Sequence, residues 1–303
     1  YTLELSSAAS DVYKRQVLFL QGGATLQFAM VPMNLLGERT AADYLDTGSW
    51  SAKAIKEAKR FCDVNVVASA TDHIPSSQEW HTNPEAAYLH ICSNETSGGV
   101  QFQDFPSTDV PLVADMSSDI LSRPVDVDRF ALIYAGAQKN MGPAGLTLVM
   151  VRKDLLGKAR PGTPSMLDYA VHAEAGSMSN TPPTYAWYLA GLVFGWLQAE
   201  GGLAHMETVN RRKAAKLYAA IDNSNLYHCP VAPADRSMMN VTFTLPDSAL
   251  DGDFLAGARE AGLLNLKGHR SVGGMRASIY NAVPEAAIDA LVGYMGEFEQ
   301  TRR

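Results

Sequence analysis

The sequence predicts an α/β fold, built as a mostly parallel central sheet flanked by helices and followed by a smaller α+β domain. Short apolar runs recur from Val17 onward, and runs of roughly 4–8 such residues are typical of strands buried on both faces. Helical patterns lie between several of these runs, and strand–helix alternation indicates a parallel sheet. The chain has 303 residues, and domains average about 150 residues, so we expect two.

The first two hundred residues supply the sheet and its covering helices. We expect strands at 17–20, 64–70, 87–92, 112–116, 130–135 and 146–152. A helix-like run covers 27–36, and 49–61 is a clear amphipathic helix, because Ala54, Ala58 and Phe61 share one face and lysines occupy the other. Ligands bind beyond the carboxyl ends of parallel strands, so residues that follow these runs are the candidates for chemistry.

A third helix begins at Thr181-Pro182-Pro183, where the threonine can cap the helix and proline fits its first turn. It ends at Gly201-Gly202, since glycine is typical of the residue after a helix. Its 185–197 stretch is apolar almost all round. The stretch is too short for a membrane span, which needs roughly 20 residues. We therefore expect a core helix that a neighbouring domain or a second subunit covers on every side.

The remaining sequence reads as a compact α+β unit. We expect helices at 207–221, 256–261 and 284–299, and strands at 241–245, 263–266 and 275–280. The predicted domains are a large domain at 17–200 and a small C-terminal domain at 201–303. Residues 1–16 match no element pattern and lack the apolar core of a signal peptide. They stay unassigned, as a stretch that need not be native.

Composition narrows the function classes. The chain has 25 basic and 32 acidic residues, a formal net charge of −7, and no basic stripe, which argues against nucleic-acid binding. Its cysteines, Cys62, Cys92 and Cys229, are widely spaced and odd in number. We therefore expect neither a disulfide framework nor a metal site, but buried thiols in a cytoplasmic protein.

The most informative candidate is Lys139, which follows the predicted strand at 130–135 and precedes a turn with Gly142, Pro143 and Gly145. A lysine at this place would be partly desolvated, which lowers its pKa and frees the neutral amine that Schiff-base chemistry requires. The local pattern also fits an ordinary surface lysine beside a turn.

Four other candidates lie beyond strand ends or near glycines. Asp115 closes an apolar run and needs a cationic partner such as a pyridinium nitrogen, or it caps the following turn. Gly22-Gly23 before a helix could aim backbone amides at an anion, or form only a turn. Trp50 could stack on a flat ring or belong to the core. The 267–276 segment, with His269, Arg270 and Arg276, could bind carboxylate and phosphate or be a solvated basic loop.

Taken together, these segments resemble the phosphoserine aminotransferase family, class-V members of the fold-type I pyridoxal-phosphate enzymes. The resemblance runs in one order from about residue 17 to the C-terminus. It rests on SNET at 93–96, ADMSS at 114–118 with LSRP at 121–124, YAGAQKNMGPAGL at 134–146, NTPPTY at 180–185 and KGHRSVGGMRASIYN at 267–281. Five motifs in one order are more specific than any single motif.

The resemblance implies a role for each matching residue. Lys139 would bind the cofactor as a Schiff base and move the substrate proton, and Asp115 would pair with the pyridine nitrogen. Trp50 would stack on the ring, and Thr96 would bond near its hydroxyl. The cofactor phosphate would be bound by Ala24, Thr25 and Gln138, with Asn180 and Thr181 of a partner subunit. Arg276 would bind the substrate α-carboxylate, while His269 and Arg270 would reach the distal anion across a dimer.

The implied activity is transamination between phosphoserine and 2-oxoglutarate, in serine and also pyridoxine biosynthesis, by a cytoplasmic homodimer. The sequence departs from the family twice. Thr25 stands where some relatives have an arginine, and nothing before Val17 matches the family's N-terminal arm with its His-Arg pair. The alternatives are therefore a catalytically impaired dimer, truncated at its N-terminus, and another small-substrate class-V aminotransferase. A cysteine desulfurase fits less well, because each cysteine lies in or beside an apolar run.

Overall fold

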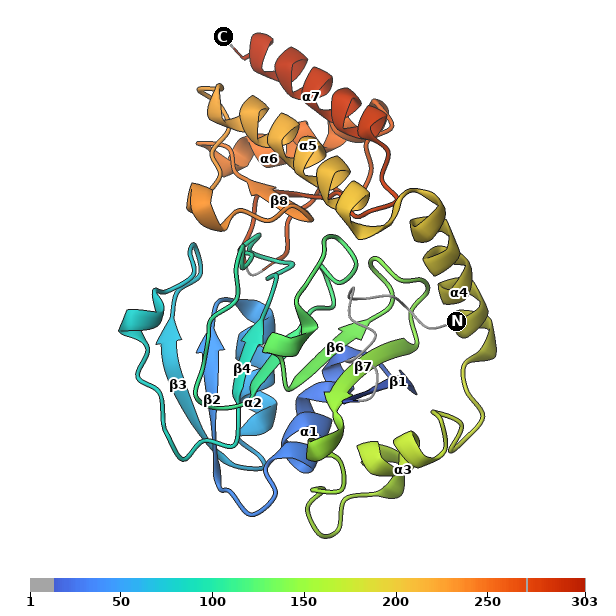
Figure 1. The fold of residues 1–303 in the computed structure, drawn as a ribbon. Helices are drawn as coiled ribbons and strands as arrows, with labels where there is room; N and C mark the ends of the chain where they lie inside the picture. Colours follow the sequence, from blue (N-terminus) through green and yellow to red (C-terminus); the bar gives the residue numbers. More distant parts are fainter. Residues whose placement is uncertain (1–13, 271, 303) are drawn as a thin grey trace.

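A seven-stranded sheet forms the larger part of the molecule (Figure 1). The computed structural model describes residues 14–270 and 272–302, so most of the unassigned 1–16 stretch lies outside the described residues. The strand order is β1-β7-β6-β5-β4-β2-β3. Neighbours from β6 to β3 pair in parallel, while β7 is antiparallel to β6 and to β1. The predicted α/β class, with a mostly parallel central sheet, is confirmed.

The strands of this sheet match most of the predicted runs. Their bounds are β1 Arg15–Gln21, β2 Ala41–Asp46, β3 Asp63–Ser69, β4 Leu89–Cys92, β5 Leu112–Asp115, β6 Leu132–Gly136 and β7 Leu146–Arg152. The sequence analysis missed β2 because its two aspartates obscure the apolar run. Asp43 is buried, and its carboxylate accepts hydrogen bonds from the side chain of Asn65 and the backbone of Asn83, which offset the cost of burying it.

Burial on both faces holds for the central strands but not for the edges. Every residue of β4, β5 and β6 is buried, whereas β1 and β3, at the two ends of the strand order, carry exposed positions. The prediction of uniformly buried strands is wrong there, because an edge strand has a neighbour on one side only. β1 also begins at Arg15, two residues inside the stretch that matched no pattern.

Helices and loops cover the two faces of the sheet. On one face, α1 Ala24–Leu35, α2 Ser49–Ala58 and α3 Tyr169–Glu174 pack against a core that includes Tyr44 and Tyr134. On the other face, the loops after β4 and β5 and the inner side of α4 Thr184–Ala199 enclose a second core.

The outer side of α4 is exposed within this chain. Tyr185 is 71%, Tyr188 63% and Leu192 53% exposed. The described residues therefore place no layer over that side, and within them α4 is not the core helix that the sequence predicts. Cover by a second subunit stays a prediction.

The C-terminal part has its own core above the sheet (Figure 1). Helices α5 Gly202–Asp222, α6 Asp251–Glu260 and α7 Glu285–Gln300 pack on the antiparallel pair β8 Asn240–Phe243 and β9 Met275–Ser278. The predicted strand at 263–266 is wrong, because Asn265 has a left-handed φ of 62° that interrupts an extended run. Short 3₁₀ helices lie at Ser77–Glu79, Val127–Arg129, Lys153–Leu155, Ser165–Leu167, Pro233–Asp235 and Ser248–Leu250.

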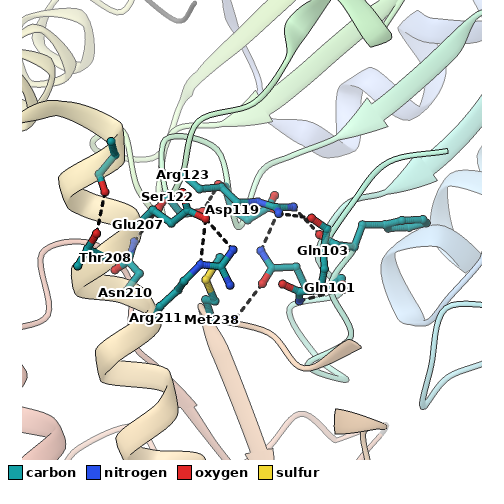
Figure 2. A network of polar contacts seen from close by, with 12 residues as sticks. Gln101, Gln103, Asp119, Ser122, Arg123, Glu207, Thr208, Asn210, Arg211 and Met238 are labelled. Carbon is teal, nitrogen blue, oxygen red and sulfur yellow. Dashed lines mark hydrogen bonds and ion pairs between the residues drawn. The ribbon is translucent and has the colours of Figure 1, made fainter. Parts of the chain in front are cut away.

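Buried polar contacts join the two parts (Figure 2). Gln101 donates to Asp119 at 3.0 Å and accepts from the Met238 amide at 2.8 Å, and Asn210 on α5 donates to the Ser122 carbonyl at 3.0 Å. Buried groups of this kind are costly to unpair, so the network fixes how the parts meet. Within the described residues, no helix is both long enough and apolar enough to cross a membrane.

Candidate active site

A cavity of about 280 Å³ opens at the carboxyl ends of β4, β5 and β6, beside the first turn of α1. Seven of the predicted site residues line it, from five separate segments of the chain: Ala24, Thr25, Trp50, Thr96, Asp115, Gln138 and Lys139. The position agrees with the rule that α/β sheets bind ligands beyond their carboxyl strand ends.

Lys139 lies three residues after the end of β6 and projects its amine into this cavity. The Nζ atom donates a hydrogen bond to Thr96 Oγ1 at 2.7 Å. Burial lowers the pKa of Lys139, the charge of Asp115 raises it in part, and the charge of Arg276 lowers it further. Since burial is the largest cause, a neutral, nucleophilic amine is more accessible here than on a surface lysine.

Asp115 is the last residue of β5 and is 5% exposed. Its Oδ1 accepts two hydrogen bonds from Ser117, from the amide at 2.9 Å and from the hydroxyl at 2.6 Å. Burial raises the pKa of Asp115, while the Ser117 bonds and the charge of Lys139 lower it. Asp115 therefore caps the turn through Oδ1 and also lines the cavity, so the two interpretations of this residue are compatible.

The first turn of α1 offers backbone amides to the cavity. Gly22 and Gly23 precede the helix with φ of 109° and 153°, and a Cβ at Gly22 would lie 2.8 Å from Leu26 Cδ2. The amides of Ala24 and Thr25 belong to a first turn, where helical N–H groups have no intrahelical partner. This turn is suited to an anion such as a phosphate group.

Trp50 is the second residue of α2 and forms one wall of the cavity. Lys139 Nζ lies 5.4 Å and Lys53 Nζ 3.8 Å from the centroid of its ring. Its indole Nε1 is buried and has no hydrogen-bond partner among the residues that the structure describes. The ring is thus placed to cover a flat group held between Lys139 and Asp115.

Arg276 stands at the edge of the site. It lies on β9, and its guanidinium donates to the Thr96 carbonyl at 3.4 Å. This contact brings the only candidate from the C-terminal strands within reach of Lys139, as the effect of Arg276 on the lysine pKa also indicates.

The chain does not bring the other four candidates to the cavity. Asn180 lines a separate cavity of about 150 Å³ beside β1, and the Thr181 carbonyl accepts a hydrogen bond from Gln21 at 2.6 Å. His269 and Arg270 lie in the turn before β9, where Gly268 donates to the Gly274 carbonyl. All four are residues for which the resemblance implies a role across a dimer.

Several functional neighbours escaped the sequence analysis. Ser117 holds Asp115 and accepts a hydrogen bond from the Gly136 amide at 3.0 Å, which ties β5 to β6. Cys92, Asn94 and Ser118 also line the cavity. The serine pair after Asp115 was the available signal, since hydroxyls commonly bond to a turn's carboxylate and amides.

The residues present fit pyridoxal phosphate. The cavity combines a lysine whose pKa is lowered, a buried aspartate whose Oδ2 accepts no bond from the residues that the structure describes, an aromatic wall and a helix N-terminus. These groups suit an aldehyde, a protonated ring nitrogen, a flat ring and a phosphate, respectively.

Comparisons with known proteins agree with this chemistry. The sequence model described as aminotransferase class-V matches residues 9–291, eight residues before the expected start at 17. A phosphoserine aminotransferase of Ectopseudomonas mendocina is 61% identical over 298 residues, covering 97% of this chain and 82% of the relative.

Two solved structures are similar over nearly the whole chain. The phosphoserine aminotransferase of Bacillus circulans subsp. alkalophilus has a TM-score of 0.93 and 48% identity, covering 96% of this chain and 82% of that one. The enzyme of Trichomonas vaginalis, solved with pyridoxal phosphate bound, has a TM-score of 0.91 and 42% identity, covering 93% and 82%.

Proposed function

Since this chain belongs to the class-V aminotransferases, and within them to the phosphoserine aminotransferase family, we propose that it transfers an amino group between phosphoserine and 2-oxoglutarate. The family depends on pyridoxal phosphate. The single observation that carries the proposal is the convergence of Lys139, Asp115, Trp50 and the first turn of α1 on one cavity.

The cofactor would be bound by the residues that line this cavity. Lys139 would hold it covalently, and Asp115 would bind the protonated ring nitrogen. Trp50 would cover the ring, and Thr96 would bond beside the ring hydroxyl. The amides of Ala24 and Thr25, with the side chain of Gln138, would bind the phosphate.

The chemistry divides between the cofactor and the chain. When bound, pyridoxal phosphate supplies a protonated ring that accepts the electron pair released when the substrate Cα–H bond breaks. Lys139 moves that proton, as a base at the substrate α-carbon and then as an acid at the cofactor C4′ carbon. Asp115 keeps the ring nitrogen protonated, because an adjacent negative charge raises the pKa of that nitrogen.

Substrate binding needs two anion sites. Arg276 would bind the α-carboxylate that both substrates share, since its planar guanidinium can pair with a carboxylate through two bonds. His269 and Arg270 would bind the second anion, which is a phosphate in phosphoserine and a carboxylate in glutamate. One cluster of cationic donors can accept either group, so the same site can serve both half-reactions.

The proposal includes a homodimer in which each site is shared. Asn180 and Thr181 of a partner subunit would complete the phosphate site, and His269 and Arg270 would act across the interface. The exposed side of α4 supports this, because Tyr185, Tyr188 and Leu192 form an apolar surface that a second copy would cover. We further assign the enzyme to serine biosynthesis and to pyridoxine biosynthesis, in the cytoplasm.

Steady-state kinetics test the proposed substrates. Purified protein loaded with pyridoxal phosphate should convert phosphoserine and 2-oxoglutarate to 3-phosphohydroxypyruvate and glutamate, and Lys139→Ala should reduce kcat by several orders of magnitude. Serine should react far more slowly, because it lacks the distal anion. Transfer from alanine to glyoxylate without phosphoserine turnover would instead identify another class-V aminotransferase. Cofactor binding without any turnover would identify the impaired form.

A further inference from the structure

Glu95 is a buried carboxylate that the reaction described above does not use. It is 0% exposed and lies between Asn94 and Thr96, two residues that line the cavity. Its Oε2 accepts a hydrogen bond from the Trp50 amide at 3.0 Å. Its Oε1 accepts from the Ser51 amide and the Ser51 hydroxyl, both at 2.8 Å. Both carboxylate oxygens therefore bind the first turn of α2.

This contact suits the electrostatics of the helix. The first turn of a helix carries free N–H groups and a partial positive charge, which a carboxylate stabilises. Burial raises the pKa of Glu95, and the hydrogen bonds from Ser51 and Trp50 lower it. Glu95 thus occupies the N-terminus of α2, whereas the N-terminus of α1 stays open to the cavity.

The carboxylate is also held sterically. Gly48 precedes α2 with φ of 155°, and a Cβ at this position would lie 2.9 Å from Glu95 Cδ and 3.0 Å from Oε2. The glycine permits close approach between the chain before α2 and the carboxylate. A side chain packed this closely has little freedom, so it fixes the helix end to which it is bonded.

The residues on either side of Glu95 connect the same segment to the rest of the site. Thr96 accepts the Lys139 hydrogen bond on its hydroxyl and the Arg276 bond on its carbonyl. Asn94 donates to Asn240 at 2.8 Å, across to β8. The segment 94–96 is therefore the element against which Lys139, Arg276 and, through Glu95, Trp50 are all positioned.

We propose that Glu95 is a positioning residue. It holds the Trp50 indole against the cofactor cavity, at its present distance from the Lys139 amine. It acts through the backbone of Trp50 and Ser51. The inference rests on the proposed stacking role of Trp50. Weakening the Glu95 contact should tilt or loosen the indole, and so weaken cofactor binding, while leaving Lys139 and Asp115 in place.

Glu95→Gln tests the proposal with nearly the same shape. The amide keeps one acceptor oxygen, but its NH₂ group faces an N–H donor of α2, and the negative charge is lost. In cofactor-free protein labelled with 5-fluorotryptophan, the Trp50 ¹⁹F resonance, assigned with Trp50→Phe, should shift or broaden. The resonances of Trp80, Trp187 and Trp196 should not change. The dissociation constant for pyridoxal phosphate should rise about tenfold, as expected when one charge-assisted hydrogen bond is weakened.

A double-mutant comparison separates positioning from general loss of structure. Adding Glu95→Gln to Trp50→Ala should change the cofactor dissociation constant less than about twofold, because the ring that Glu95 positions is gone. Asp119→Asn is the matched control: Asp119 is another buried carboxylate whose charge interacts with that of Lys139, but it accepts its hydrogen bonds from the side chains of Ser93 and Gln101. It should leave the Trp50 resonance unmoved.

Two results would overturn the positioning role: an unmoved Trp50 resonance in folded Glu95→Gln, or an equal loss of cofactor affinity with and without Trp50. Unchanged affinity in Trp50→Ala alone would instead refute the stacking role, which distinguishes the two failures. If Glu95→Gln does not fold, amide exchange in the unaltered cofactor-free protein decides the positioning role. Protected Trp50 and Ser51 amides support it, and exchange at free-peptide rates refutes it.

Discussion

The hydrogen bond from Lys139 to Thr96 predicts how the lysine titrates in cofactor-free protein. The Thr96 hydroxyl accepts this bond from the ammonium form, so it favours the charged state. Thr96→Val removes the acceptor and should lower the pKa of Lys139 further, because the ammonium form loses a hydrogen bond that stabilises it. The pH dependence of Lys139 acylation measures this, and the midpoint should move to lower pH.

Thr242→Val is the control for this titration. Thr242 is also buried, but its hydroxyl donates a hydrogen bond to the Gly98 carbonyl, and the bond from Lys139 goes to Thr96. It should leave the midpoint unchanged. A midpoint that stays in place or rises in Thr96→Val would contradict the role of Thr96.

Asp115 gives a second prediction at the scale of one residue. Asp115→Asn keeps the size of the side chain and the Oδ1 acceptor of the turn, but it removes the charge that we propose sustains a protonated ring nitrogen. We expect kcat to fall about a hundredfold or more, roughly 3 kcal/mol at 1.36 kcal/mol per factor of ten. Stopped-flow measurement of the phosphoserine half-reaction checks this. A variant that retains most of the parent rate would show that Asp115 does not act on the ring.

At this scale, the sequence predicted residues with a chemical signature and missed those defined by their contacts. Lys139 and Asp115 follow apolar runs, so the strand pattern alone marked them as strand-end residues. Glu95 lies in a segment that the sequence analysis singled out, but its bonds reach Trp50 and Ser51, about 45 positions earlier in the chain. A single sequence does not reveal contacts over such a separation.

Among the elements, α5 carries a fully buried lysine. Lys213 is 0% exposed, and its Nζ donates to the carbonyls of Ile279, Tyr280 and Val283 at 2.9–3.0 Å. These bonds fix the turn that follows β9, the strand of Arg276. Lys213→Met would remove a charged donor from three carbonyls, of which only that of Tyr280 keeps another donor among the residues that the structure describes, the Val283 amide. The change should lower the free energy of unfolding by about 3 kcal/mol, as measured by urea denaturation.

Lys216→Met on the same helix is the comparison. Lys216 is partly exposed and pairs with Glu285 and Asp289. Because such surface pairs contribute little, this variant should lose less than about 1 kcal/mol. Similar losses in the two variants would contradict a special role for the buried lysine.

The element pattern was predictable where apolar periodicity is strong. Strands β4 to β7 and helices α2 and α7 lie within a few residues of their predicted bounds. The missed strand β2 and the wrong strand at 263–266 share a cause. In each, the local composition predicts a different backbone conformation from the one that the folded chain adopts. In β2, hydrogen bonds compensate a buried aspartate. At 263–266, a left-handed Asn265 interrupts a run of leucines.

For the whole molecule, the exposed side of α4 predicts the oligomeric state. Tyr188→Glu would place an unpaired charge in the proposed subunit interface, which is strongly unfavourable. We expect a monomer in sedimentation velocity and loss of turnover, because the site would lose Asn180, Thr181, His269 and Arg270 of the partner. Ala215→Glu on the exposed side of α5 is the control and should remain dimeric. A dimeric, active Tyr188→Glu protein would exclude this surface as the interface.

The two-part organisation was largely predictable, whereas the joint between the parts was not. The division at residue 200 stays a prediction, and the separate core of the C-terminal helices supports it. The joint consists of polar side chains such as Gln101, Asp119 and Asn210 (Figure 2). In sequence, these residues are indistinguishable from surface residues. Their burial arises only when both parts are folded.

Borohydride reduction of the cofactor-loaded protein, followed by peptide mass spectrometry, tests the central claim most directly. Reduction fixes the bond between lysine and cofactor, so the modified residue can be read from the peptide that carries the added mass. We predict modification of Lys139 alone, and none in protein first converted by phosphoserine, whose amino group displaces the lysine. Modification of Lys53, the other lysine beside Trp50, or no change on adding phosphoserine, would contradict the account.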